Sequence, residues 1–186
     1  MLPKVSVFIA TSLDGYIARE NGDLDWLDDA NTTVPEGEDY GFAAFMATVD
    51  MLVMGRKTYE QVLAFGEWPY GDTPITVMSR KPVELPDNVP KTVTHSSESP
   101  QELCDRLELN GIRHIYVDGG NTVQRFLSAK LVDEITLSII PILLGSGIPL
   151  FSSQYSDVKL SCLETKQYDS GIIQLKYRIK NNVSNA

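Results

Sequence analysis

The hydrophobic pattern of the first two thirds of the chain alternates short apolar runs with segments of helical periodicity. The runs have the length and composition of strands buried on both faces of a parallel sheet, and they span residues 5–10, 51–54, 75–78 and 114–118. Between them, apolar residues recur three and four positions apart, which predicts helices; these stripes are Phe42, Phe45, Met46 and Val49, then Tyr59, Val62 and Leu63, then Val123, Phe126 and Leu127. A capping box, Ser99 with Glu102, predicts one more helix start.

A period of two replaces this pattern near the C-terminus. Apolar and polar residues alternate over residues 134–140 and again over residues 172–180, which is typical of strands with one buried and one wet face. Residues 158–168 form another extended candidate, and residues 169–171 supply a turn before the last strand. The pattern therefore predicts an α/β fold with a mostly parallel central sheet and antiparallel C-terminal strands.

One long segment has neither period. Residues 19–37 are polar and rich in Asp, Asn and Gly, which predicts a long loop, and loops of this length in compact domains often face a ligand. Trp26 inside it is expected to anchor the loop to the core.

Length, composition and charge indicate the number of domains and argue against some classes of protein. With 186 residues, 42% of them hydrophobic, the chain can bury a substantial core, and we expect a single domain over residues 1–180 and a flexible C-terminal tail over residues 181–186. The formal net charge of -9 argues against general binding to nucleic acid or to anionic membranes. No run reaches the length of a membrane span and no signal-peptide pattern is present, so we expect a cytoplasmic protein.

Three of the predicted strands end in residues that suit an anionic ligand, at residues 55–58, 79–81 and 119–122. The carboxyl ends of parallel strands meet at one edge of a sheet, so these loops can converge on one crevice. Glycines let backbone N–H groups approach a pyrophosphate, and the guanidinium of Arg80 can grip a phosphate through two hydrogen bonds. Two cationic pairs in an acidic chain favour NADPH, with its additional phosphate, over NADH.

Each loop also has a simpler explanation. Two glycines after a strand often form only a tight turn, and lysine or arginine at a strand end is commonly solvated. Neither G-x-G-x-x-G nor the P-loop motif occurs, which argues against a standard Rossmann or P-loop site. The prediction of a cofactor site therefore depends on the coincidence of the three loops.

In combination, these loops resemble a known family. Residues 54–59, followed by Ser79-Arg80 and then by Asp118-Gly119-Gly120, are similar to the cofactor signature of the dihydrofolate reductase fold. Residues 12–18, 131–135 and 141–147 look closer to one branch of it, the C-terminal reductase domain of the bifunctional riboflavin-biosynthesis deaminase/reductase and its stand-alone relatives. The likeness runs from about residue 5 to about residue 180.

This resemblance implies a three-layer dihydrofolate reductase-like domain and an NADPH-dependent oxidoreductase. Hydride transfer would reduce 5-amino-6-(5-phosphoribosylamino)uracil or a related small heterocyclic or ribose-type substrate. The implied cofactor residues fall into four groups: Gly55, Arg56, Lys57 and Thr58 at the adenosine and pyrophosphate end, Ser79 and Arg80 at the 2′-phosphate, Gly119, Gly120, Asn121 and Thr122 at the pyrophosphate, and Ala10 and Ile17 against the nicotinamide.

The proton donor is less well marked. Folate reductases carry a carboxylate at a fixed distance before the Met-Gly-Arg motif, and the same count back from Met54 reaches Asp39, which we predict as the catalytic acid. Acids also occur in the first turn of a helix for electrostatic reasons alone. Further substrate-facing candidates, chosen by position, are Thr11, Trp26 and Tyr59. Asp14 is interpreted as a turn former, Cys104 as a core thiol, and no residues have the spacing of a metal site.

One departure from the folate reductases bears on the substrate. They place an arginine a few residues before the Ser-Arg strand end to bind the glutamate carboxylate of folate, and this chain has Thr73 there. Dihydrofolate reductase or another pterin or carbonyl reductase therefore stays as an alternative, and a non-catalytic NADPH-binding protein is another. The apolar run over residues 139–144 and the amphipathic last strand would expose apolar surface at a sheet edge, which predicts a homodimer.

Overall fold

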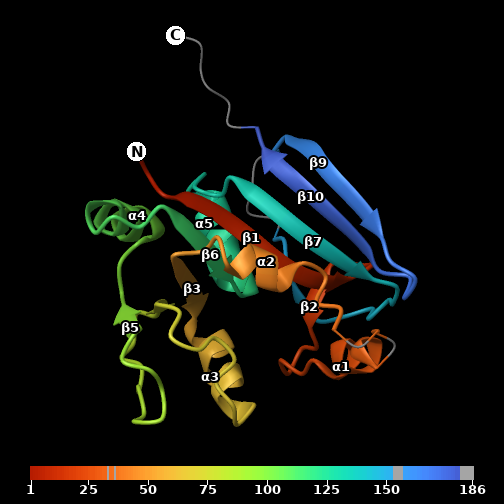
Figure 1. Cartoon of the computed structure of the whole chain (residues 1–186), viewed down its shortest axis with the longest axis horizontal. Helices are drawn as coiled ribbons and strands as arrows, with labels where there is room; N and C mark the ends of the chain where they lie inside the picture. Colours follow the sequence, from red (N-terminus) through yellow and green to blue (C-terminus); the bar gives the residue numbers. More distant parts are fainter. Residues whose placement is uncertain (33, 36, 153–156, 181–186) are drawn as a thin grey trace.

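The computed structural model describes residues 1–32, 34–35, 37–152 and 157–180. Its main sheet has eight strands in the order β5-β4-β3-β6-β1-β7-β10-β9 (Figure 1). Neighbouring strands are parallel from β5 to β7, and β10 runs antiparallel to β7 and β9. The strands of this sheet are β1 (Lys4–Ser12), β3 (Met51–Gly55), β4 (Ile75–Met78), β5 (Val93–Ser96), β6 (His114–Asp118), β7 (Glu134–Ile140), β9 (Leu160–Gln167) and β10 (Ile173–Ile179). The predicted sheet is confirmed.

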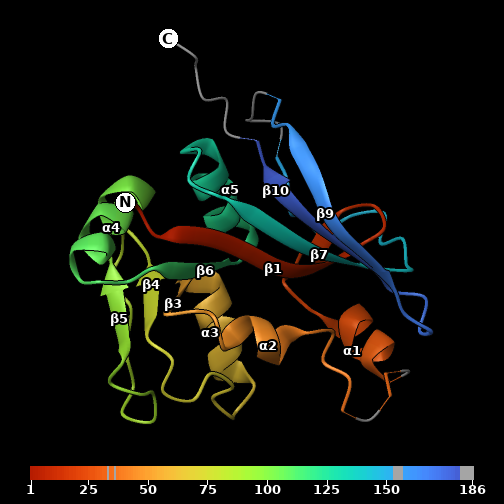
Figure 2. The ribbon, with the colours of Figure 1, turned by 45° about the horizontal axis from the view of Figure 1, so that its top comes forward.

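Helices cover both faces of the sheet and give the fold three layers (Figures 1 and 2). The helices are α1 (Asp25–Asn31), α2 (Phe42–Met46), α3 (Arg56–Ala64), α4 (Pro100–Leu109) and α5 (Gly120–Ser128). Side chains of α4 and α5 pack with one face, and side chains of α2 and α3 pack with the other. Among the described residues, no helix combines the length and apolar character needed to cross a membrane.

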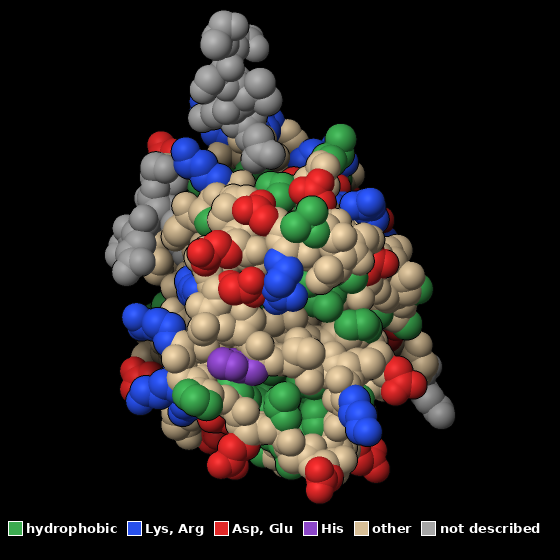
Figure 3. Space-filling view, turned by 90° about the vertical axis from the view of Figure 1, so that its left-hand side faces the viewer, with side chains coloured by type: hydrophobic (Ala, Val, Ile, Leu, Met, Phe, Trp, Pro, Cys, Tyr) green, Lys and Arg blue, Asp and Glu red, His purple; other side chains and the backbone are tan. Residues whose placement is uncertain are grey.

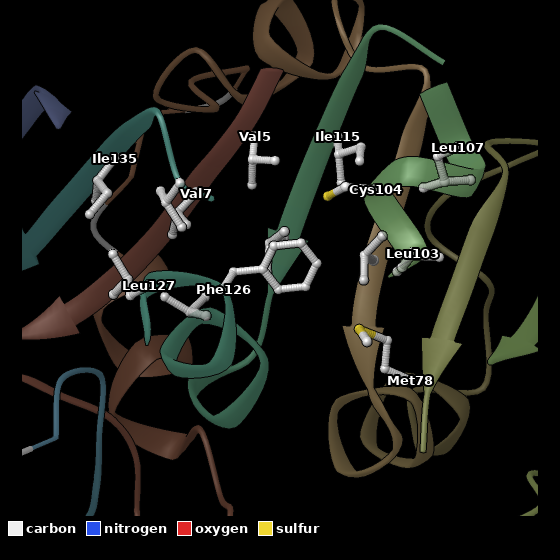
Figure 4. Packing of buried hydrophobic residues seen from close by; sticks show 14 of the residues in the cluster. Val5, Val7, Met78, Leu103, Cys104, Leu107, Ile115, Phe126, Leu127 and Ile135 are labelled. Carbon is white, nitrogen blue, oxygen red and sulfur yellow. The ribbon is translucent and has the colours of Figure 1, made fainter. Parts of the chain in front are cut away.

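The core beneath α4 and α5 holds the strands that carry the site. Figure 4 shows Val5 and Val7 of β1 and Ile115 of β6 among side chains of these helices. Phe126 of α5 is fully buried there. Cys104 lies in this cluster with 1% of its surface exposed, and burial raises the pKa of its thiol to about 11. The prediction of a core thiol is confirmed.

Two helices differ from the sequence prediction. The segment over residues 19–37, predicted as a loop, contains α1, a short helix whose buried residue Trp26 is 2% exposed and does anchor it to Ile140 and Ile172. The sequence pattern does not predict this helix, because it is short and rich in acids such as Asp25 and Asp28, so its few apolar residues show no clear helical period. The predicted stripe of the second helix runs on to Val49, whereas α2 ends at Met46.

Local signals elsewhere are confirmed. Both capping-box hydrogen bonds between Ser99 and Glu102 are present at the start of α4. The turn before β10 closes through a hydrogen bond from Gly171 N to Tyr168 O, 2.9 Å long. The tail predicted for residues 181–186 lies outside the described residues.

A small second sheet pairs β2 (Tyr16–Ala18) with β8 (Ile148–Pro149). Asp14 ties this region together, because its carboxylate accepts hydrogen bonds from the Ser12 hydroxyl and from the backbone N–H groups of Leu144 and Gly145. These bonds, that from Ser12 first, lower the pKa of Asp14. The interpretation of Asp14 as a turn former is confirmed, and the turn presents Ile17 to the edge where the parallel strands end.

Candidate functional site

The three predicted ligand loops follow strands that are direct neighbours in the sheet. In the order β4-β3-β6-β1, the carboxyl ends of all four parallel strands reach one edge. Gly55 ends β3 and begins the turn into α3, Gly119 lies between β6 and α5, and Ser79 follows β4. The sheet therefore brings residues 55–58, 79–81 and 119–122 to the same edge.

The starts of α3 and α5 interlock through small residues. A Cβ atom on Gly55 would lie 2.8 Å from Thr122 Oγ1, at the start of α5. Conversely, a Cβ atom on Gly119 would overlap Thr58 Oγ1, at the start of α3. Each glycine thus makes room for the threonine of the other helix, and the two helix starts lie side by side.

Both helix starts are open to an anion. Neither the Gly55 end of α3 nor the Gly119 end of α5 has a side-chain cap, and neither first turn contains an acid. Helix α4, which starts elsewhere, has both a cap and Glu102 in its first turn. Uncapped N–H groups at a helix start bind phosphates and carboxylates. The two adjacent starts therefore form a site suited to a negatively charged group.

Substitution of Gly119 by alanine tests this packing. We expect G119A to lower the free energy of unfolding by about 3 kcal/mol, because φ at Gly119 is +86° and the new methyl group would also overlap Thr58. Gly66 is a matched control, since its φ is +83° and a Cβ atom there meets nothing within 4 Å. Urea unfolding of both variants separates backbone strain from crowding. Equal losses in G119A and G66A would contradict the interlocked packing.

The third loop contributes cations. Within the described part of the chain, neither the guanidinium nor the backbone N–H of Arg80 has a hydrogen-bond or ion-pair partner. Ser79 donates its N–H to Ser96 O at 2.9 Å, and its hydroxyl accepts a hydrogen bond from Lys81 N at 3.1 Å. Arg56, by contrast, pairs with Glu60 at 2.8 Å. Within the described residues Arg80 is therefore a cation available to a ligand, as are the side chains of Lys57 and Lys81, which also have no ion-pair partner there.

The edge continues through residues predicted to face the nicotinamide. A Cβ atom on Gly120 would lie 2.9 Å from Ile17 Cδ1 and 3.3 Å from Pro149 O, so the β2–β8 pair rests directly on the start of α5. Ala10 is partly buried and packs with the cluster of Trp26. The structure thus brings Ile17 to Gly120, next to the other predicted cofactor residues, and places Ala10 near the end of β1.

Asp118, which the sequence marks only as part of the Asp118-Gly119-Gly120 signature, has an unusual environment in the structure. It is the last residue of β6, and its carboxylate accepts a hydrogen bond from Gly119 N at 2.8 Å. Burial raises the pKa of this carboxyl to about 6, against the opposing effect of the Gly119 bond. Burial, with a smaller contribution from the Asp118 charge, raises the pKa values of Tyr70 and Tyr116. An acid directly before two glycines was the available signal, and here it is a carboxyl that can hold a proton near neutral pH.

Asp39, the predicted catalytic acid, is exposed and caps the start of α2. Its carboxylate accepts hydrogen bonds from Ala43 N at 2.7 Å and Gly41 N at 2.8 Å, and these bonds lower its pKa. A carboxylate held ionised in this way is a weak proton donor at neutral pH. Its role as catalytic acid stays a prediction.

The other substrate-facing candidates are buried. Thr11 is 3% exposed, and Tyr59 is 1% exposed with its hydroxyl donating to Glu84 O. Trp26 lies in the core cluster described above. Their side chains contribute to packing, and a direct contact with substrate stays a prediction for each.

A separate groove of about 380 Å³ lies between α2 and strands β1, β7, β9 and β10. Lys4, Ser6, His114 and Gln174 are among the residues that line it. None of the predicted cofactor residues lines it. In the described residues, no group of three or more His, Cys, Asp or Glu side chains could hold a metal ion.

The strand order, the helices on both faces and the glycine-led helix starts at the carboxyl edge define a dihydrofolate reductase-like α/β protein. A dihydrofolate reductase from Enterococcus faecalis shares this fold, with a TM-score of 0.61 and 16% identity over 96% of this chain and 97% of that one. The profile of the RibD C-terminal domain matches residues 3–174. The chain belongs to this family.

Two relatives of similar length and one longer protein support the assignment. YwjB from Bacillus subtilis (strain 168) is 37% identical, covering 94% of this chain and 97% of the relative. The structure of a protein named for riboflavin biosynthesis, from Shewanella sp. PV-4, matches with a TM-score of 0.89 and 38% identity, covering 97% of this chain and all of that one. A deaminase/5-amino-6-(5-phosphoribosylamino)uracil reductase from Thermotoga maritima shares the fold, with a TM-score of 0.73 and 19% identity. This chain spans 57% of its length.

Proposed function

We propose that the chain is an NADPH-dependent reductase of the riboflavin-pathway pyrimidine reductase type. The observation that carries this proposal is the pair of uncapped helix starts, which pack together through their glycines and threonines. They lie at the same edge of the sheet as Arg80, which has no partner among the described residues. Membership of the RibD C-terminal domain family supports it. The name of the Thermotoga relative supplies the substrate class, a phosphoribosylaminopyrimidine.

The residues present fit NADPH. The glycines let the threonines of the two helix starts pack closely, so the uncapped N–H groups of α3 and α5 lie side by side and can bind one pyrophosphate. Ser79 and Arg80 would hold the 2′-phosphate, and Ile17 would lie against the nicotinamide ring. When bound, NADPH supplies a hydride from C4 of that ring. The protein's part is to hold the electrophilic carbon of the substrate in line with it and to provide a proton.

We assign that proton to Asp118. The substrate carbon gains the hydride, and the oxygen or nitrogen that receives the displaced electron pair gains the proton. Burial keeps a fraction of the Asp118 carboxyl protonated near pH 6, whereas the capping bonds of Asp39 keep that carboxyl ionised. A general acid is most effective when its pKa is near the working pH. Asp118 also lies at the carboxyl end of β6, directly before Gly119 and the start of α5, and on both grounds we propose it ahead of Asp39.

Purified wild-type protein tests the proposal. NADPH binding is measured by fluorescence titration, and turnover is measured as NADPH oxidation in the presence of 5-amino-6-(5-phosphoribosylamino)uracil. Absence of NADPH binding would refute it. Rapid turnover of dihydrofolate would instead identify a folate reductase and overturn the interpretation of Thr73. Binding without oxidation across a broad substrate panel would identify a non-catalytic NADPH-binding protein.

We also propose a homodimer. Every residue of β9 except Ser161 is exposed, and Leu160 and Leu163 at this sheet edge are each 41% exposed. A second copy would cover this edge. We expect sedimentation analysis to show a dimer that Leu163→Asp weakens by at least about tenfold, with Leu109→Asp on α4, 88% exposed, as the unaffected control. A wild-type protein that sediments as one chain would contradict the proposal.

A further inference from the structure

A histidine on the neighbouring strand braces the loop that carries Arg80. His95 lies on β5, paired in register with Val77 of β4. It is an exposed residue. On the face of the molecule shown in Figure 3, acidic and basic side chains are interspersed. The ring atom Nε2 lies 2.8 Å from the carbonyl oxygen of Ser79. A carbonyl oxygen only accepts, so Nε2 carries the hydrogen and donates it.

This hydrogen bond fixes the peptide group between Ser79 and Arg80. A peptide group is planar, and in the trans form its C=O and N–H point in opposite directions. The described residues contain no cis peptide bond. With the Ser79 carbonyl held by His95, the Arg80 N–H must therefore point away from His95.

The Arg80 N–H is left free in this orientation. It has no hydrogen-bond partner among the described residues, although Ser79 N and Lys81 N on either side of it both have one. A hydrogen bond accepted by the carbonyl also polarises the peptide and strengthens its N–H as a donor. The loop therefore presents one prepared backbone donor and one unpartnered guanidinium on the same residue.

We propose that His95 is a positioning residue that sets the affinity for the 2′-phosphate of the cofactor. It orients the Ser79–Arg80 peptide so that the Arg80 N–H donates to the phosphate that the guanidinium also holds. This inference rests on the proposed NADPH dependence. It differs from a purely structural role for His95, in which the ring would only strengthen the contact between β4 and β5.

Two substitutions separate these roles. His95→Ala removes the donor, whereas His95→Gln keeps a side-chain N–H that can reach the Ser79 carbonyl. Calorimetric titration with adenosine 2′,5′-bisphosphate, with 5′-AMP as the ligand lacking the 2′-phosphate, reports on the phosphate alone. We expect His95→Ala to weaken binding of the bisphosphate about fivefold and to leave 5′-AMP unchanged, and His95→Gln to restore most of the loss.

The outcomes distinguish the two proposals. Wild-type protein that binds the bisphosphate no more tightly than 5′-AMP would refute the NADPH preference and this inference with it. A wild-type preference that persists at full strength in His95→Ala would refute the role of His95 alone. An equal loss for both ligands in His95→Ala, without rescue by His95→Gln, would show a structural role and would also refute it.

Discussion

Replacement of Asp118 by asparagine is expected to lower kcat by about 100-fold or more while NADPH affinity stays near that of the wild type. Asparagine keeps the size of the side chain but has no proton to give. The dependence of kcat/KM on pH provides a second test of Asp118 as the proton donor. Because the pKa of Asp118 is raised to about 6, kcat/KM of the wild type is expected to fall as the pH rises through that value, and D118N is expected to lack this decline. Steady-state assays over a pH series measure both.

Asp39→Asn is the matched control, because it makes the same chemical change at the competing carboxylate. If D39N takes the large loss in kcat and D118N does not, Asp39 is the proton donor and the assignment to Asp118 is wrong. D39N is expected instead to lose some stability, since the side chain caps α2 through Gly41 and Ala43.

Whereas D39N is expected to lower the free energy of unfolding, D118N is expected to raise it at neutral and higher pH. A carboxyl whose folded pKa is raised is protonated in both states well below pH 4, and the unfolded chain ionises first as the pH rises. The native state therefore loses stability between about pH 4 and the folded pKa of about 6, and the loss persists above it. As the residue is partly exposed, we expect D118N to be about 1 kcal/mol more stable than the wild type at pH 8 and equal to it well below pH 4. Urea unfolding at the two pH values checks this sign.

Replacement of Arg80 by alanine is expected to weaken NADPH binding by about 10- to 100-fold and NADH binding by less than about twofold. The guanidinium has no partner within the described chain, so its removal breaks no structural bond and the loss reports on the ligand. Fluorescence titration of both cofactors measures the ratio. The ratio is expected to shrink at high salt, because screening weakens the interaction of exposed charges.

The control for Arg80 is Arg113→Ala. Arg113 is also exposed, and it precedes β6 at the opposite edge of the sheet, so its removal changes the net charge equally without touching the proposed phosphate site. Equal effects of the two substitutions, or equal losses of NADPH and NADH in R80A, would contradict a 2′-phosphate site at Ser79 and Arg80.

The sheet and the edge that carries the site could be predicted from local patterns. Strands β3, β4 and β6 are short apolar runs that lead into Gly55, Ser79 and Gly119. Both the apolar run and the turn residue that follows it can be recognised from neighbouring positions in the sequence. The loops at Gly55, Ser79 and Gly119 follow from the same signal, since the carboxyl ends of parallel strands meet at one edge.

What could not be predicted depends on residues far apart in the chain. The raised pKa of Asp118 arises from burial at the end of β6, and its sequence neighbours do not reveal that environment. The close packing of Gly55 against Thr122 joins residues far apart in the chain, and no periodic pattern in the sequence relates them. For Asp39, spacing predicts a catalytic acid, which stays a prediction, but spacing does not reveal the hydrogen bonds by which its carboxylate caps α2.

The interlocked helix starts also determine when the site can form during folding. One half comes from residues 55–58 and the other from residues 119–122, and β1, at the beginning of the chain, pairs with β6 and β7 rather than with any early strand. The N-terminal strand must therefore wait for partners more than a hundred residues away, and such long-range closure slows folding. A nascent chain that still lacks α5 has only half of the proposed phosphate site, so the proposed cofactor is expected to bind only after β6 and α5 have joined β3.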